Sequence, residues 1–293
     1  MTGYLQAAPR SRATRRESRQ RQGNQDVVPP LSRPSLMLTA SEFPRWTLEA
    51  GWGTLLASVL PAPNVGNGRP VLVLPGFLAG DGLTAPLRHH LRNHGFYAHP
   101  WRLGRNYGLT DDILDGVLDR FDALHARHGE PISLVGWSFG GLLGRWLAHA
   151  RPESARQVIC LGSPWRPEGE QTRMTALFNL ATDHYGASRR ALEVVEAIRR
   201  PVPVPCTAIY SRSDGVLHWR SCTVEGAATE NIAVPSSHAG LVCNPLALAV
   251  VTDRLAQDAL TPRRFRWQHC VGRLLRDTQA TKNANALPSV DAA

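Results

Sequence analysis

The sequence predicts an α/β domain in which helices cover both faces of a mostly parallel sheet. Two observations lead to this prediction. First, short apolar runs alternate with longer segments of helical spacing over about residues 70–258, a pattern typical of a parallel sheet enclosed by helices. Second, a Gly-x-Ser-x-Gly motif stands between one of the expected strands and the helix that follows it. A hydrophobic content of 43% and a charged content of 19% are also typical of a globular protein.

Six short apolar runs, most of them rich in Val, Ile and Leu and bounded by Gly or Pro, are the expected strands. Each is too short for a helix and lies next to a turn signal. They are RPVLVLPGF (69–77), GFYAHP (95–100), PISLVG (131–136), QVICLGSP (157–164), PCTAIYS (205–211) and TENIAVP (229–235).

Apolar residues three or four positions apart predict the helices that alternate with these strands. The clearest such segments are 82–94, 110–128, 139–150 and 244–259. A further helical segment, 36–60, precedes the first strand. Its apolar residues either cover an edge of the core or form an interfacial patch; core cover is favoured because cationic residues are nearly absent from its polar face. These apolar residues are Trp46, Leu48, Trp52, Leu55, Leu56 and Leu60.

The net charge of +9 belongs to the two ends of the chain. Residues 1–35 carry +5 and residues 262–293 carry +4, whereas residues 36–261 hold 20 Arg and 20 acidic residues. A nucleic-acid-binding domain needs a basic face on its folded part, so a specific nucleic-acid partner is not expected. We expect both ends to be basic tails, the first of them disordered, with a weak peripheral membrane contact left open. A further hypothesis, that the native chain starts at Met37, would be contradicted by natively expressed peptides from residues 1–36.

The segment 165–204 is long for a plain connection between two strands. Its many apolar residues predict a small helical cap above the carboxyl edge of the sheet. The expected organisation is therefore a basic tail (1–35), one domain with its cap (36–261) and a second basic tail (262–293).

Cysteine usage and the absence of a leader favour a cytoplasmic protein. The five cysteines form no Cys-x-x-Cys pair and no zinc-binding spacing, and an odd number favours free thiols in a reducing compartment. The stretch TRRESR resembles a twin-arginine signal, but PPLSRP follows instead of an apolar region. No apolar run reaches about 18 residues, so a membrane span is not expected.

The motif occurs in LVGWSFGG (134–141), where Gly136 and Gly140 lie two residues either side of Ser138. A serine between a strand and a helix can adopt a strained conformation that lifts its oxygen above the sheet. The flanking positions must then be small because neighbouring backbone passes close to them. The following helix also directs its first N–H groups towards charge that develops beside the serine.

With Asp214 and His238 after two later strands, residues 70–258 resemble the α/β-hydrolase superfamily of lipase-like and esterase-like serine hydrolases. The resemblance implies the α/β-hydrolase fold and a catalytic triad. Ser138 would be the nucleophile, His238 the base and Asp214 the group that orients His238. Asp183, in the expected cap, is an alternative acid that fits the topology less well.

The resemblance also implies an oxyanion hole formed by the backbone N–H groups of Phe77 and Phe139. Two positions depart from the common pattern of the family. Pro75 stands where many relatives have His before Gly, and Trp137 stands where His often precedes the nucleophile. Neither change removes a backbone donor, but both leave the subfamily and the substrate open.

The expected activity is hydrolysis of a carboxylic ester through an acyl-enzyme, on a small-molecule or lipid substrate with a hydrophobic acyl or alkyl part. Thioesterases and acyltransferases use the same three residues and remain alternatives, as does a non-catalytic binding scaffold with this fold. No motif implies a cofactor, and no residue spacing predicts a metal site.

Overall fold

The computed structural model describes residues 33–59, 62–165, 190–226, 228–258 and 263–268. All of these residues belong to one compact unit, Leu31–Ala293. Most of both predicted tails, and residues 166–189 of the predicted cap, lie outside the described residues.

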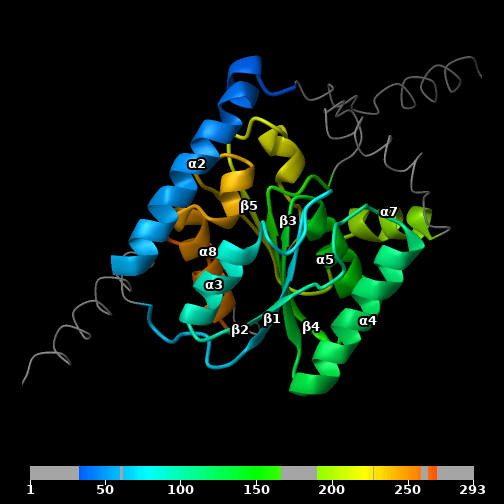
Figure 1. Cartoon of the computed structure of the whole chain (residues 1–293). Coiled ribbons are helices and arrows are strands. Elements are labelled where there is room, and N and C mark those ends of the chain that lie inside the picture. The colour runs from blue at the N-terminus through cyan, green and yellow to red at the C-terminus, as the bar shows by residue number, and fades with distance from the viewer. Residues whose placement is uncertain (1–32, 60–61, 166–189, 227, 259–262, 269–293) are drawn as a thin grey trace, which may run out of the picture. The chain divides into compact units, whose positions relative to one another are not determined.

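Six parallel strands form one sheet in the order β2-β1-β3-β4-β5-β6 (Figure 1). β1, β3 and β5 are buried along their whole length, as expected for strands covered on both faces. All six strands lie within a few residues of the predicted runs, so the predicted fold class is confirmed. Their bounds are β1 Pro70–Leu74, β2 Tyr97–Pro100, β3 Ile132–Trp137, β4 Ala155–Leu161, β5 Cys206–Tyr210 and β6 Thr229–Ala233.

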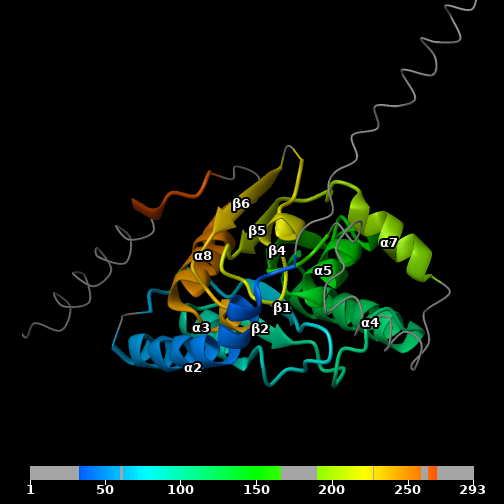
Figure 2. The same ribbon diagram turned by 90° about the horizontal axis from the view of Figure 1, so that it is seen from above.

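Helices cover both faces of the sheet (Figure 2). α3 (Ala85–Asn93) and α8 (Pro245–Ala256) pack on one face, and α4 (Asp111–His128), α5 (Phe139–Ala150) and α7 (Ala191–Arg199) pack on the other. Each face has its own cluster of buried apolar side chains. The sheet therefore separates two hydrophobic cores.

Local sequence signals explain where α4 begins and ends and where α8 begins. The Thr110 side chain accepts a hydrogen bond from the Ile113 N–H at the start of α4, and Gly129, with φ 66°, ends this helix. The Asn244 side chain accepts hydrogen bonds from the first N–H groups of α8. Two short 3-10 helices, η1 (Trp219–Cys222) and η2 (Ala239–Val242), lie in the loops after β5 and β6.

The helix α2 (Leu36–Val59) precedes the sheet and lies beside α8 and η2. The predicted core-covering role is wrong for Leu48, Trp52 and Leu55, whose exposed fractions are 66%, 60% and 54%. The physical reason is that α2 turns its charged residues towards the domain, as described below for Glu42 and Glu49. No helix among the described residues is long and apolar enough to cross a membrane.

α7, the described part of the predicted cap segment, packs against α5 and the core of that face. Its carboxyl end is held by Arg145 of α5, which is almost fully buried. The Arg145 guanidinium donates to Ile198 O at 2.6 Å and to Arg200 O at 3.2 Å. A cation at this position also interacts favourably with the helix dipole.

We expect Arg145→Ala to lower the free energy of unfolding by about 3 kcal/mol, because the buried Ile198 carbonyl and the partly buried Arg200 carbonyl lose a charged donor. Arg151→Ala is the matched control at the end of the same helix. The Arg151–Asp122 ion pair is about 40% exposed on both sides, and its loss should cost less than about 1 kcal/mol. Chemical denaturation of both variants measures the difference, and equal costs would contradict the assignment.

Candidate active site

Ser138 lies at the sharp turn between β3 and α5, with φ 53° and ψ −123°. Non-glycine residues rarely adopt this conformation, so surrounding contacts must hold it. The neighbouring strand β4 holds the turn, because the Ser138 N–H donates to Leu161 O at 2.7 Å. Gly136 and Gly140 are both required: a Cβ on either would lie 2.3 Å from backbone atoms of Gly140 or Leu74, respectively.

Ser138 and His238 line the same pocket, which has a volume of about 310 Å³. Residues from α2, from the loop after β1, from β3 and from the loops after β5 and β6 contribute to its wall. The remaining lining residues are Glu42, Phe43, Trp46, Gly76, Phe77, Trp137, Val216 and Ala239. Most of these side chains are apolar, so the pocket suits an apolar ligand group next to a serine and a histidine.

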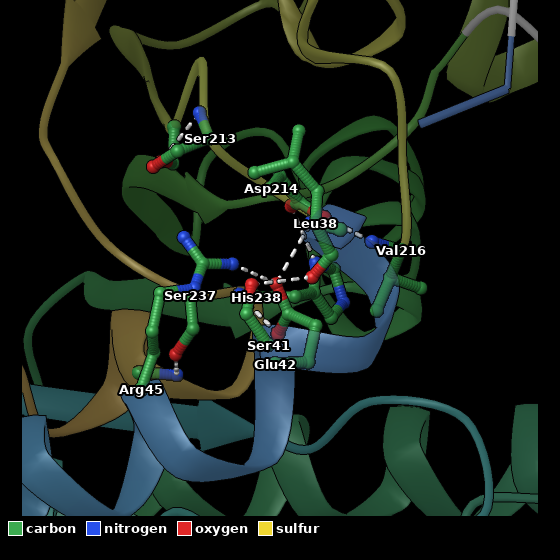
Figure 3. Close-up of polar contacts among 12 residues, drawn as sticks. Leu38, Ser41, Glu42, Arg45, Ser213, Asp214, Val216, Ser237 and His238 are labelled. Atoms are coloured by element: carbon green, nitrogen blue, oxygen red, sulfur yellow. Dashed lines mark hydrogen bonds and ion pairs between the residues drawn. The ribbon is translucent and has the colours of Figure 1, made fainter. Parts of the chain in front are cut away.

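Asp214 and His238 form a buried hydrogen-bonded pair (Figure 3). His238 Nδ1 lies 2.7 Å from Asp214 Oδ2, and both side chains are almost fully buried. The other carboxylate oxygen, Oδ1, accepts hydrogen bonds of 2.8 Å from the Val216 and Leu217 N–H groups. The Asp214 carboxylate is therefore fixed by its own loop and leaves one oxygen for the imidazole.

The surroundings of His238 raise its pKa above the ordinary value of 6.5. Burial opposes this shift, because it disfavours the charged imidazolium. The negative charge of Asp214, its hydrogen bond to the ring, and the negative charge of Glu42 outweigh the effect of burial. The site therefore favours a positively charged imidazole, as a base that takes up a proton during a reaction requires.

The loop after β1 brings Phe77 to the pocket, next to Ser138. Gly76 packs so closely that a Cβ on it would lie 3.1 Å from Ser138 Cβ, and the Phe77 ring contacts the Phe139 ring at 6.2 Å between centroids. Asn106, which is fully buried, fixes this loop. Its side chain donates to Pro75 O at 2.8 Å, and its backbone O accepts from the Leu78 N–H at 2.7 Å.

Two further contacts hold the loops that carry Asp214 and His238. The Trp137 indole donates to His238 O at 3.0 Å, so the departure from the family pattern at this position has a structural role. The Ser211 hydroxyl donates to Ser236 O at 2.6 Å and joins the loop after β5 to the loop after β6.

Two glutamates of α2, which the sequence did not single out, reach the same loops. Glu42 accepts hydrogen bonds from the Gly215 and His238 N–H groups at 2.7 and 2.8 Å. Glu49 accepts one from the Ser237 N–H at 2.8 Å. The available signal was their spacing: they are the only acidic residues of α2 and lie seven positions apart, on one face of a helix.

Asp183, the alternative acid, lies outside the described residues. Within the described ranges, no group of three or more His, Cys, Asp or Glu side chains could hold a metal ion.

Solved structures share this arrangement of strands and helices. Aspergillus fumigatus lipase B matches over 75% of this chain with a TM-score of 0.55 and 17% identity, and the matched region spans 62% of that lipase. The chain has the α/β-hydrolase fold. No family model and no curated protein matches the sequence.

Weaker similarities extend to other hydrolases with this fold. A Paleococcus ferrophilus monoacylglycerol lipase aligns over 64% of this chain and 96% of its own, with 16% identity and a TM-score of 0.47. A thioesterase domain from the curacin biosynthetic pathway aligns over 66% and 92%, with 16% identity and a TM-score of 0.45.

We expect the imidazole of His238 to titrate above its ordinary range, and Asp214→Asn to lower this pKa. Asparagine removes the negative charge but keeps an oxygen for the Val216 and Leu217 N–H groups. NMR titration of the His238 ring in both proteins measures the shift without any substrate. An unchanged pKa in the variant would show that Asp214 does not set the charge of His238.

Proposed function

We propose that the protein is a serine hydrolase that cleaves a carboxylic ester through an acyl-enzyme. The observation that carries this proposal is the pocket shared by Ser138 and His238, in which His238 also hydrogen-bonds the buried Asp214 at 2.7 Å. A serine hydroxyl is a weak nucleophile until a base takes its proton. The raised pKa of His238 supports this role for the imidazole.

In the proposed reaction, Ser138 Oγ attacks the ester carbonyl carbon while His238 takes the hydroxyl proton. His238 then returns the proton to the departing alcohol, and the acyl group stays on Ser138. Water attacks the acyl-enzyme with His238 again as base, which releases the acid and restores the serine. Asp214 orients the ring and stabilises the imidazolium in both halves.

We assign the oxyanion hole to the backbone N–H groups of Phe77 and Phe139. Phe77 lies in the pocket wall, and Phe139 is the first residue of α5, where the helix dipole favours negative charge. The hold of Asn106 on the Phe77 loop supports this assignment, because an oxyanion hole requires donors fixed before the reaction begins.

The apolar wall supports a substrate with a hydrophobic acyl or alkyl part. Phe43, Trp46, Phe77 and Val216 surround the space beside Ser138. A thioester would fit the same pocket, and transfer to another alcohol would use the same residues. These reactions differ from ester hydrolysis in the leaving group or in the acceptor.

The test is hydrolysis of p-nitrophenyl esters from acetate to palmitate by the wild type and by Ser138→Ala. We expect turnover in the wild type and a loss of at least about 1000-fold in the variant, because the acyl-enzyme cannot form. A fluorophosphonate probe should label the wild type alone. Labelling without turnover would favour a thioesterase or an acyltransferase, and neither labelling nor turnover would favour the binding scaffold.

We further propose that the outer face of α2 contacts the surface of an aggregated lipid substrate. This face has no charged residue, and its large apolar side chains are between 54% and 83% exposed. Phe43 belongs both to this face and to the pocket wall, so an apolar chain could pass from one to the other. The lack of cationic residues favours an uncharged or zwitterionic lipid surface. The exposed side chains are Leu36, Met37, Phe43, Leu48, Trp52 and Leu55.

We expect the double variant Leu48→Ser/Trp52→Ser to have about tenfold lower activity on an emulsified long-chain ester, because it removes apolar area that would be buried in the lipid surface. Its activity on soluble p-nitrophenyl acetate should not change, because neither residue lines the pocket. Leu83→Ser, which changes an exposed leucine outside α2, is the control. Equal losses on both esters would contradict lipid contact. A wild-type dimer that the double variant converts to monomers would instead assign this face to a second copy of the chain.

A further inference from the structure

We propose that Glu42 of α2 is a positioning residue of the hydrolase site, which joins the loop of Asp214 to the loop of His238 from outside the sheet. The inference rests on the proposed function, to which it adds a residue from a helix that precedes the whole α/β unit. Its basis is the set of contacts that α2 makes with these two loops (Figure 3).

Each carboxylate oxygen of Glu42 is assigned to a different loop. Oε1 accepts a hydrogen bond from the Gly215 N–H at 2.7 Å, next to Asp214. Oε2 accepts one from the N–H of His238 itself at 2.8 Å. One side chain thus fixes the backbone on both sides of the Asp214–His238 hydrogen bond, and a shift of either loop would stretch that bond.

α2 packs closely against the Asp214 loop at Gly215. A Cβ on Gly215 would lie 2.4 Å from Leu38 O, and the Thr39 hydroxyl donates to Gly215 O at 2.8 Å. The Glu42 contact is therefore part of a close backbone approach between α2 and the Asp214 loop.

Four charged groups face the surroundings of His238. Asp214 contacts the ring, Glu42 contacts the backbone N–H, and Arg45 forms an ion pair of 2.6 Å with Glu42 Oε1. Glu49 lies next along α2 and binds the Ser236 hydroxyl and the Ser237 N–H. Burial lowers the pKa of His238, and the charges of Asp214 and Glu42 raise it. Glu42 therefore combines a geometric role with an electrostatic one.

Glu49 provides a matched control, because it lies on the same face of α2 and holds the same loop through the same kind of contact. Glu42→Gln and Glu49→Gln each replace a carboxylate by an amide of equal size. Both can loosen the His238 loop, but Glu42→Gln also removes a charge that raises the pKa of His238.

We expect Glu42→Gln to lower kcat by roughly ten- to hundredfold, because small displacements of reacting groups are costly. It should also move the acid limb of the pH profile of kcat/KM to lower pH. The direction of this shift follows because His238 acts as a base only when its imidazole is neutral. A lower pKa keeps the imidazole neutral down to a lower pH. Glu49→Gln should leave the acid limb where it is in the wild type. An unshifted acid limb in Glu42→Gln, or an equal shift in Glu49→Gln, would overturn the proposal.

A third variant, Glu42→Asp, keeps the charge and shortens the reach, and it covers the case in which Glu42→Gln does not fold. We expect a lower kcat with an acid limb near that of the wild type. Wild-type kcat in Glu42→Asp would overturn the positioning role.

NMR titration of the His238 ring gives the same comparison without a substrate. If Ser138 is not labelled and no ester is cleaved, the proposed function fails. The effect of Glu42 on His238 would still be measured, so the two failures are distinguishable.

Discussion

The common direction of the six strands is the constraint on which the site depends. Because all strand pairs are parallel, the carboxyl ends of β3, β5 and β6 lie at one edge of the sheet. Ser138 follows β3 directly, Asp214 follows β5 by four residues and His238 follows β6 by five. Short loops then suffice to bring together residues that are 100 positions apart in the chain. Strand pairing sets the approximate positions of the three residues, and hydrogen bonds within and between the loops set the exact distances between their side chains.

The loop contacts come from elements on every side of the site. Trp137 holds the His238 backbone from β3, Ser211 joins the loops after β5 and β6, and Asn106 fixes the loop after β1. All of these are hydrogen bonds to backbone groups in buried surroundings, where an unmade bond is costly. The site is thus preorganised mainly by side chains that hold the main chain.

The sequence predicted the sheet well because each strand carries its own signal. A run such as PVLVL is short, apolar and bounded by turns, and no distant residue is needed to recognise it. The order of Ser138, Asp214 and His238 along the chain could also be recognised from the sequence, because each of them follows one of the expected strands. The roles of Asn106 and Trp137 could not be predicted from the sequence, because each depends on hydrogen bonds to a loop elsewhere in the chain.

The orientation of α2 is the clearest case in which local pattern misled. Its apolar residues predicted a core-facing side, yet Leu48 and Trp52 point to solvent. The inward face was decided by Glu42 and Glu49, because they satisfy backbone N–H groups that would otherwise be buried without a partner. Helical periodicity considers only the residues of the helix itself, so it cannot account for N–H donors that lie almost 200 residues further along the chain.

This separation has a consequence for the order in which the protein is made. Glu42 meets the N–H groups of residues that are 173 and 196 positions later in the chain. At 5–20 residues per second, α2 waits about 10–40 s during synthesis before its partners exist. Until then the inward acidic face of α2 is without its native contacts. A nascent chain that has completed β4 already contains the groups that hold the serine turn, but the histidine loop is held in place only after the last strand has been translated.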